Sequence, residues 1–90
     1  MPYYIIERNF AEELQTPVSD ALNINLINDE EEVRWLYSFL SVDRRKTYCL
    51  YEAPSIEAIR AAAVRAGLPA DVVTELTGRV MPNGLLQTIS

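Results

Sequence analysis

The chain has 90 residues, the size of one small domain with a modest hydrophobic core. Its net charge is −5 and its densest basic run covers only residues 44–46, so it lacks the clustered Lys and Arg that neutralise phosphates, and we expect no nucleic-acid binding. No apolar run approaches the roughly 20 residues that span a bilayer, and no signal peptide is visible, so we expect a cytoplasmic protein without a membrane partner.

The residue inventory limits the chemistry that the chain can perform. It has one cysteine, Cys49, which rules out an intrachain disulfide, and no histidine. The missing histidine removes the commonest general base, the commonest metal ligand and the Ser-His or Cys-His route to a nucleophile. Any chemistry must therefore come from carboxylates, tyrosines, arginines or lysine, or from a borrowed cofactor. The residues themselves indicate no cofactor.

The first third of the chain predicts a strand and then a helix. Residues 3–9 are rich in aromatic and β-branched side chains, which favours a strand. Thr16 followed by Pro17 is typical of a helix start, with the threonine as N-cap and the proline at the first helical position. Apolar residues at helical spacing then predict a buried stripe. They are Val18, Ala21, Leu22 and Leu26, and Ile24 and Ile27 widen the stripe.

The middle of the chain predicts two strands and a second helix. Residues 33–42 and 47–53 read as strands, and the connection between them has the length of a hairpin turn. Ser55 is a natural N-cap, and Gly67 is a typical helix stop. The buried stripe of this helix is expected from Ile56, Ile59, Ala63 and Ala66.

The C-terminal part predicts a fourth strand and an arm. Residues 71–76 form the strand, and residues 77–90, interrupted by glycine and proline, form the arm, with a short extra strand expected over residues 85–89. The order is then β-α-β-β-α-β, and right-handed crossovers favour one solution for it. We expect one α+β domain over residues 1–90 with the ferredoxin-like fold: a four-stranded antiparallel sheet, both helices on one face, and a core at 3–76.

One face of this sheet, here called the open face, would carry no helix, and strand alternation predicts its residues. If Val42 and Thr47 pair across the turn, the bulky aromatic side chains of the second and third strands share one face with a carboxylate. That set suits the open face, because the other set, which holds Cys49, is smaller and suits packing under helices. The open-face residues are then Trp35, Tyr37, Phe39, Tyr48 and Glu52, with Glu7 from the first strand.

Two such faces packed together would give a dimeric α/β-barrel with a lumen between the sheets. Glu7 and Glu52 would then lie near Tyr48, and partial burial would raise the pKa of either carboxyl and make it a proton carrier or a metal ligand. The alternative is that both are strand-end carboxylates paired with Arg8 or Arg34.

Several segments of the sequence carry a family resemblance: Glu7-Arg8 with Phe10, Val33-Arg34-Trp35 with Ser38, and residues 47–55, 57–60 and 66–70. Through these segments the sequence resembles the small bacterial ferredoxin-like family described as nickel-binding-protein-like, otherwise of unknown function. It implies a protomer that forms homodimers and, in at least one relative, nickel binding.

Three functions are compatible with these residues. The first is a non-enzymatic homodimer that binds a small ligand or metal between its sheets, with Trp35, Tyr37, Phe39, Tyr48, Glu52 and Arg8 as ligand-binding residues. The second is a cofactor-independent enzyme for proton transfer, isomerisation or cyclisation, in which Glu52 or Glu7 is the base and Tyr48 orients the substrate. The third is a structural or regulatory interaction protein. Metal ligands cannot be named.

Overall fold

The computed structural model describes residues 1–15 and 18–89. Its elements are β1 (Tyr3–Asn9), α1 (Val18–Glu30), β2 (Arg34–Leu40), β3 (Lys46–Glu52), α2 (Ile56–Ala66), β4 (Val72–Leu76), β5 (Gly78–Val80) and β6 (Leu86–Thr88). The predicted order of the first six elements is confirmed. The helix start predicted at Thr16 and Pro17 lies outside the described residues.

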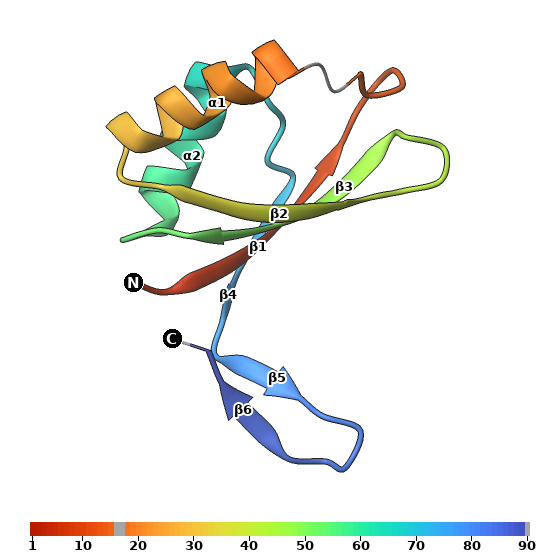
Figure 1. Ribbon diagram of the computed structural model, residues 1–90, viewed down its shortest axis with the longest axis vertical. Coiled ribbons are helices and arrows are strands. Elements are labelled where there is room, and N and C mark those ends of the chain that lie inside the picture. Colours follow the sequence, from red (N-terminus) through yellow and green to blue (C-terminus); the bar gives the residue numbers. More distant parts are fainter. Residues whose placement is uncertain (16–17, 90) are drawn as a thin grey trace.

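The main sheet has four antiparallel strands in the order β2-β3-β1-β4. Both helices cover one face of it, and no helix of the described residues lies on the opposite face, as Figure 1 shows. This arrangement is consistent with the predicted ferredoxin-like fold. Among the described residues, neither helix has the length and apolar character needed to cross a membrane.

The hydrophobic core lies between the sheet and the two helices. Because successive strand residues point to opposite faces, Tyr4 and Ile6 of β1 face the helices while Ile5 faces the other side. The buried members of the core are Tyr4, Ile6, Val33, Cys49, Tyr51, Ala53, Ile59 and Ala62. The prediction that Cys49 lies under the helices is therefore confirmed.

Helix α2 begins and ends where the sequence predicts. The Ser55 hydroxyl accepts a hydrogen bond from the Ala58 amide at 3.2 Å, which satisfies one of the free N–H groups of the first turn. Gly67 adopts a left-handed conformation with φ 69° at the other end. The buried side chains of the helix are Ile59, Ala62 and Ala63.

Helix α1 turns a different face to the sheet from the predicted one. Leu22 and Leu26, expected in the buried stripe, are exposed, whereas Ile27 packs against the core and Asn28 is buried. Apolar side chains occur on nearly all sides of this helix, so their spacing does not select a buried face. The connection to β2 contributes to the choice, because the Val33 amide donates to the Asn28 carbonyl at 2.8 Å.

The hairpin of β2 and β3 pairs two residues away from the predicted register. Leu40, rather than Val42, lies opposite Thr47. A shift of two residues leaves every side chain on its original face, because the side-chain period of a strand is two. Tyr37 and Phe39 therefore lie on the open face as predicted.

A bulge in β2 corrects the predicted position of Trp35. Trp35 lies opposite Tyr51, but Tyr37 lies opposite Leu50, so one residue of β2 has no partner between them. An extra residue reverses the faces of the strand on one side of the bulge. Trp35 accordingly shares the helix-covered face with Tyr51 and packs against the core.

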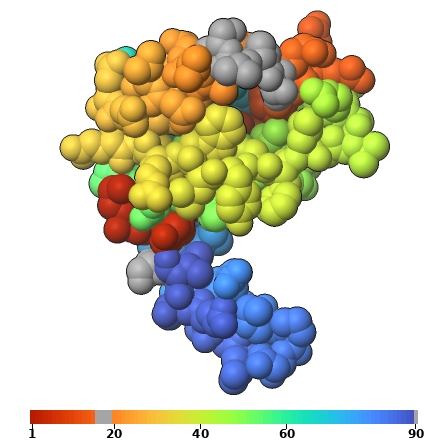
Figure 2. Space-filling view, in the orientation of Figure 1, coloured from red at the N-terminus to blue at the C-terminus, as the bar shows by residue number. Residues whose placement is uncertain are grey.

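The arm folds into a hairpin of β5 and β6 that projects from the side of the sheet opposite the helices (Figures 1 and 2). The predicted strand at residues 85–89 corresponds to β6, whereas β5 was not predicted. Gly84, with φ 83°, occupies the turn between them. Val80 and Leu86 of this hairpin are exposed, so the arm has no buried core of its own.

Candidate functional site

The open face carries large apolar side chains at the positions where the strands alternate away from the helices. Tyr37 and Phe39 are 53% and 63% exposed, and Tyr48 and Val72 are also exposed. The rings of Tyr37 and Phe39 meet edge to face with centroids 5.5 Å apart. The register places Tyr48 opposite Phe39, so three of the four aromatic residues predicted for the open face form one continuous surface.

A hollow lies between the open face and the arm. Its volume is about 420 Å³. The sheet side of the hollow is formed by Tyr3, Ile5, Tyr37, Phe39, Leu50 and Leu76, and the arm side by Gly78, Arg79 and Ile89. The lining of the hollow is mostly apolar, and Arg79 is its one charged residue among those described.

The structure separates the two predicted carboxylates. Glu7 lies opposite Tyr48 and Glu52 lies opposite Tyr3, so the two positions are four residues apart along the paired strands. At roughly 3.3 Å per residue this is about 13 Å, too far for both groups to act on one small reacting centre. Glu7 and Tyr48 are brought together as predicted, and Glu52 is not.

Each carboxylate has its own cation. Lys46 Nζ donates to Glu7 Oε1 at 2.8 Å and lies 5.7 Å from the centroid of the Tyr48 ring. The hydrogen bond to Glu7 raises the pKa of Lys46. Glu52 Oε1 lies 3.3 Å from Arg34 Nη1. The alternative that these are paired carboxylates is therefore confirmed for Glu52 with Arg34, while the partner of Glu7 is Lys46.

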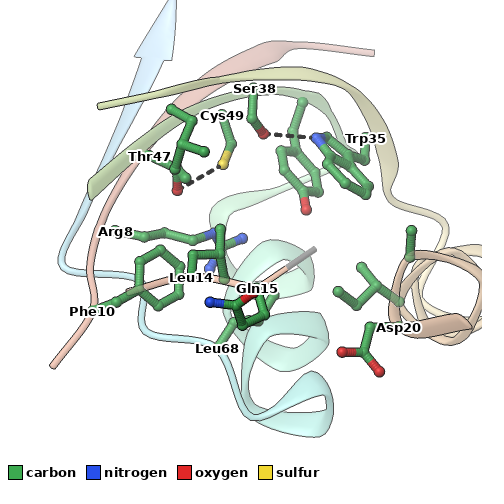
Figure 3. Close-up of a pocket in the computed structure, with 14 residues that line it drawn as sticks. Arg8, Phe10, Leu14, Gln15, Asp20, Trp35, Ser38, Thr47, Cys49 and Leu68 are labelled. Atoms are coloured by element: carbon green, nitrogen blue, oxygen red, sulfur yellow. Dashed lines mark hydrogen bonds between the residues drawn. The ribbon is translucent and has the colours of Figure 1, made fainter. Parts of the chain in front are cut away.

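A second hollow, here called the helix-side pocket, lies between the sheet and α1 (Figure 3). Its volume is about 260 Å³. The described residues that line it are Arg8, Phe10, Leu14, Gln15, Asp20, Ala21, Ile24, Trp35, Ser38, Leu40, Thr47, Cys49, Tyr51 and Leu68. Trp35, predicted for the open face, and Arg8, predicted to bind a ligand between the sheets, thus belong to this pocket.

Arg8 is the charged residue in the floor of the helix-side pocket. It is only 3% exposed, and its Nη1 donates to the Pro69 carbonyl at 2.5 Å. Its guanidinium lies 5.8 Å from the centroid of the Tyr51 ring, within cation–π range. Burial raises the pKa of the Tyr51 hydroxyl, and the neighbouring Arg8 charge opposes that rise.

Four neutral side chains in the same pocket form two hydrogen-bonded pairs. Trp35 Nε1 donates to Ser38 Oγ at 2.9 Å, and Cys49 Sγ donates to Thr47 Oγ1 at 3.4 Å (Figure 3). A hydroxyl that accepts one bond still has its own hydrogen to donate. Ser38 and Thr47 therefore retain donor capacity beside the pocket.

The basic turn between β2 and β3 holds one wall of the helix-side pocket in place. Arg44 Nη2 donates to the Leu14 carbonyl at 3.0 Å, and the Arg45 side chain donates to the Ala11 carbonyl. The Phe10 amide donates to the Arg45 carbonyl at 2.8 Å. The turn between β2 and β3 thus fixes the segment that contributes Phe10 and Leu14 to the pocket.

Sequence reasoning missed the helix-side pocket as a site, although part of its signal was present. Arg8 shares the alternation phase of Tyr4 and Ile6, which places it on the helix-covered face by the same rule that places Glu7 on the open face. Phe10 and Leu14 carry no comparable signal, because their segment has neither strand nor helix periodicity.

The described residues contain no group of three His, Cys, Asp or Glu side chains placed to hold a metal ion. Cys49 is buried, and its thiol faces Thr47 on the helix side, away from Glu7 and Glu52. Nickel in proteins favours imidazole and mixed nitrogen and oxygen ligands, and this sequence has no imidazole. The donor set of one copy therefore does not fit a nickel site.

Comparison with known proteins identifies similar sequences and folds. A family model described as "Nickel responsive protein SCO4226-like" matches residues 4–76. The crystal structure of SCO4226 from Streptomyces coelicolor A3(2) is similar with a TM-score of 0.71 and 21% identity, over 82% of this chain and 94% of that chain. At this identity the likeness shows a shared fold. No curated protein matches the chain significantly.

Proposed function

Because the chain belongs to the SCO4226-like family of nickel responsive proteins, we propose that it is a non-enzymatic small-ligand-binding protein. In this proposal it pairs with a second copy through the open face, and the ligand occupies the space between the two sheets. The family resemblance supports a binding function, because it implies nickel binding in at least one relative.

The observation that carries the proposal is the exposure of the open face. Tyr37, Phe39 and Tyr48 form a continuous aromatic surface without a helix over it. Monomeric proteins rarely leave a contiguous apolar surface of this kind in water, and such surfaces mark association or ligand sites. A second copy is a fitting cover, because the same surface on each copy gives a self-complementary interface with twofold symmetry.

The hollow beside this face is evidence that the protein binds a small ligand in addition to a second copy. Its volume of about 420 Å³ falls within the size range of small-molecule pockets. One wall comes from the sheet and the other from the arm, so a second copy would close the remaining side. The lining suits an apolar or aromatic small molecule.

The geometry favours binding over catalysis. A general base must act on the same substrate as the group that orients it. Glu52 is four register positions from Tyr48, and Glu7 is ion-paired with Lys46. Because nickel does not fit the donors of one copy, the proposed ligand is organic.

The association part is tested with two matched substitutions. Phe39→Glu places a charge on the open face, and Val64→Glu places the same charge on the outer side of α2, where Val64 is 80% exposed. We expect Phe39→Glu to convert a dimer into a monomer in sedimentation equilibrium and Val64→Glu to leave the dimer intact. Equal masses for both variants would contradict an interface at the open face.

The ligand part is tested with the dye 8-anilinonaphthalene-1-sulfonate, which becomes fluorescent in apolar sites. The dimer is expected to bind it, and Leu50→Trp, which fills the hollow from the sheet, is expected to reduce this binding. A dimer that binds no dye would have its inter-sheet space filled by side chains. That result would replace ligand binding with a purely structural role.

A further inference from the structure

Arg8 is a buried cation without a buried anion. Its side chain is 3% exposed, and no carboxylate among the described residues lies within 4.0 Å of its guanidinium. Its described hydrogen bond is to the uncharged Pro69 carbonyl. Removing a charge from water costs several kcal/mol unless a counter-charge or a full set of hydrogen bonds replaces the water.

Counted over the described residues, Arg8 has donors left for a ligand. A guanidinium has five N–H donors in a planar fork that matches a carboxylate, and the Pro69 carbonyl takes up one nitrogen. In Figure 3 the Arg8 side chain extends inward among the residues that line the pocket. The hydroxyls of Ser38 and Thr47 line the same pocket.

The size and lining of the pocket indicate the rest of the ligand. About 260 Å³ exceeds the roughly 150 Å³ cavity that holds benzene in an engineered protein, so one ring with a small substituent fits. Most of the lining is apolar, with aromatic side chains from Phe10, Trp35 and Tyr51. Asp20 is the one carboxylate among the described lining residues, and it would repel a second negative charge on the ligand.

We propose that the helix-side pocket binds a small organic monocarboxylate, with its carboxylate on Arg8 and a ring-sized apolar body against Trp35 and Phe10. This site is on the opposite face of the sheet from the proposed inter-sheet site. It requires no second copy, so the two proposals succeed or fail independently.

The test uses the full chain and a pair of probes that differ in charge. Cyclohexanecarboxylate carries the proposed anion, and cyclohexanecarboxamide has nearly the same shape without the charge. Trp35 is the single tryptophan of the chain and lines the pocket, so its fluorescence reports binding directly. We expect saturable binding of the carboxylate in the millimolar to micromolar range of about nine-atom ligands, and at least about tenfold weaker binding of the amide, because charge-assisted hydrogen bonds are lost.

Three variants locate the site. Arg8→Met should weaken carboxylate binding by about tenfold or more, whereas Arg34→Met, which removes the same charge from the other face, should leave binding unchanged. Ala21→Leu fills the pocket from α1 with Arg8 intact and should also weaken binding, which keeps the test valid if Arg8→Met does not fold.

Several results would overturn the proposal. Equal affinities of the two probes would show that the charge of Arg8 does not select an anion. No saturable Trp35 response to the carboxylate would show that Arg8 serves only to join β1 to the Pro69 segment. Equal losses in Arg8→Met and Arg34→Met would show nonspecific attraction, and tight binding of inorganic phosphate alone would remove the role of the apolar wall.

Discussion

Glu7 and Arg8 are neighbours in the sequence and face opposite sides of the sheet. Glu7 is partly exposed on the open face and is bound by Lys46, whereas Arg8 is buried under the helices and reaches Pro69. The strand geometry of β1 therefore assigns the acid to the proposed interface and the base to the helix-side pocket. Two consecutive residues of β1 thus belong to two chemically different surfaces.

Asp43 allows a pH-dependent prediction at the residue scale. Its carboxylate accepts hydrogen bonds from the Ser41 hydroxyl at 2.6 Å and the Arg45 amide at 3.0 Å, and these lower the pKa of Asp43. Because the pKa of Asp43 is lower in the folded than in the unfolded chain, the ionised carboxylate stabilises the fold at pH values above the ordinary aspartate pKa of about 3.9. This stabilisation is lost as the pH falls through the pKa of the folded state. Asp43→Ala should therefore lower the free energy of unfolding more at pH 7 than at pH 3.

Urea denaturation at the two pH values checks this prediction. Asp29→Ala, on the exposed part of α1, controls for the loss of one negative charge. A difference between Asp43→Ala and the unmodified chain that stays constant or grows at pH 3 would contradict the role of these hydrogen bonds.

At the scale of helices and strands, features set by neighbouring residues can be predicted from the sequence, whereas features set by pairing with another strand cannot. The limits of α2 follow from Ser55 and Gly67, which act on the nearest turn and so can be predicted from the sequence. The face of Trp35 depends on a bulge against β3, which the sequence of β2 alone does not reveal. The same holds for α1, whose buried face is not selected by its own apolar spacing.

The C-terminal end of α2 allows a prediction about the stability of the fold. Gly67 has φ 69°, where a residue with a Cβ is strained, and the space around a Cβ there is open. Gly67→Ala should therefore destabilise the fold through backbone strain alone, by about 1 kcal/mol. Thermal or urea unfolding measures this change, and a variant as stable as the parent would contradict the assigned conformation.

For the whole molecule, the sheet separates two candidate sites. The helices and core cover one face and enclose the pocket around Arg8, while the other face and the arm expose apolar side chains. An isolated two-stranded hairpin is marginally stable in water, so the arm gains most from contact with a partner. The arm and the open face therefore fit one interface rather than two.

The donor inventory of the whole chain predicts weak nickel binding. The sequence has no histidine, and the described residues provide no group of three metal-binding side chains. After equilibrium dialysis against Ni²⁺ and a wash with buffer, elemental analysis should find nickel well below one ion per chain. Retention of one ion per chain or per pair of chains would mean that ligands from two copies combine.

The mass of the unmodified protein in solution tests the central claim most directly. Multi-angle light scattering during gel filtration at micromolar concentration should give twice the 10.2 kDa mass of one chain, because in the proposed dimer a second copy covers the open face. A mass of 10.2 kDa across that range would contradict the claim, since the aromatic surface and the arm would then remain in water.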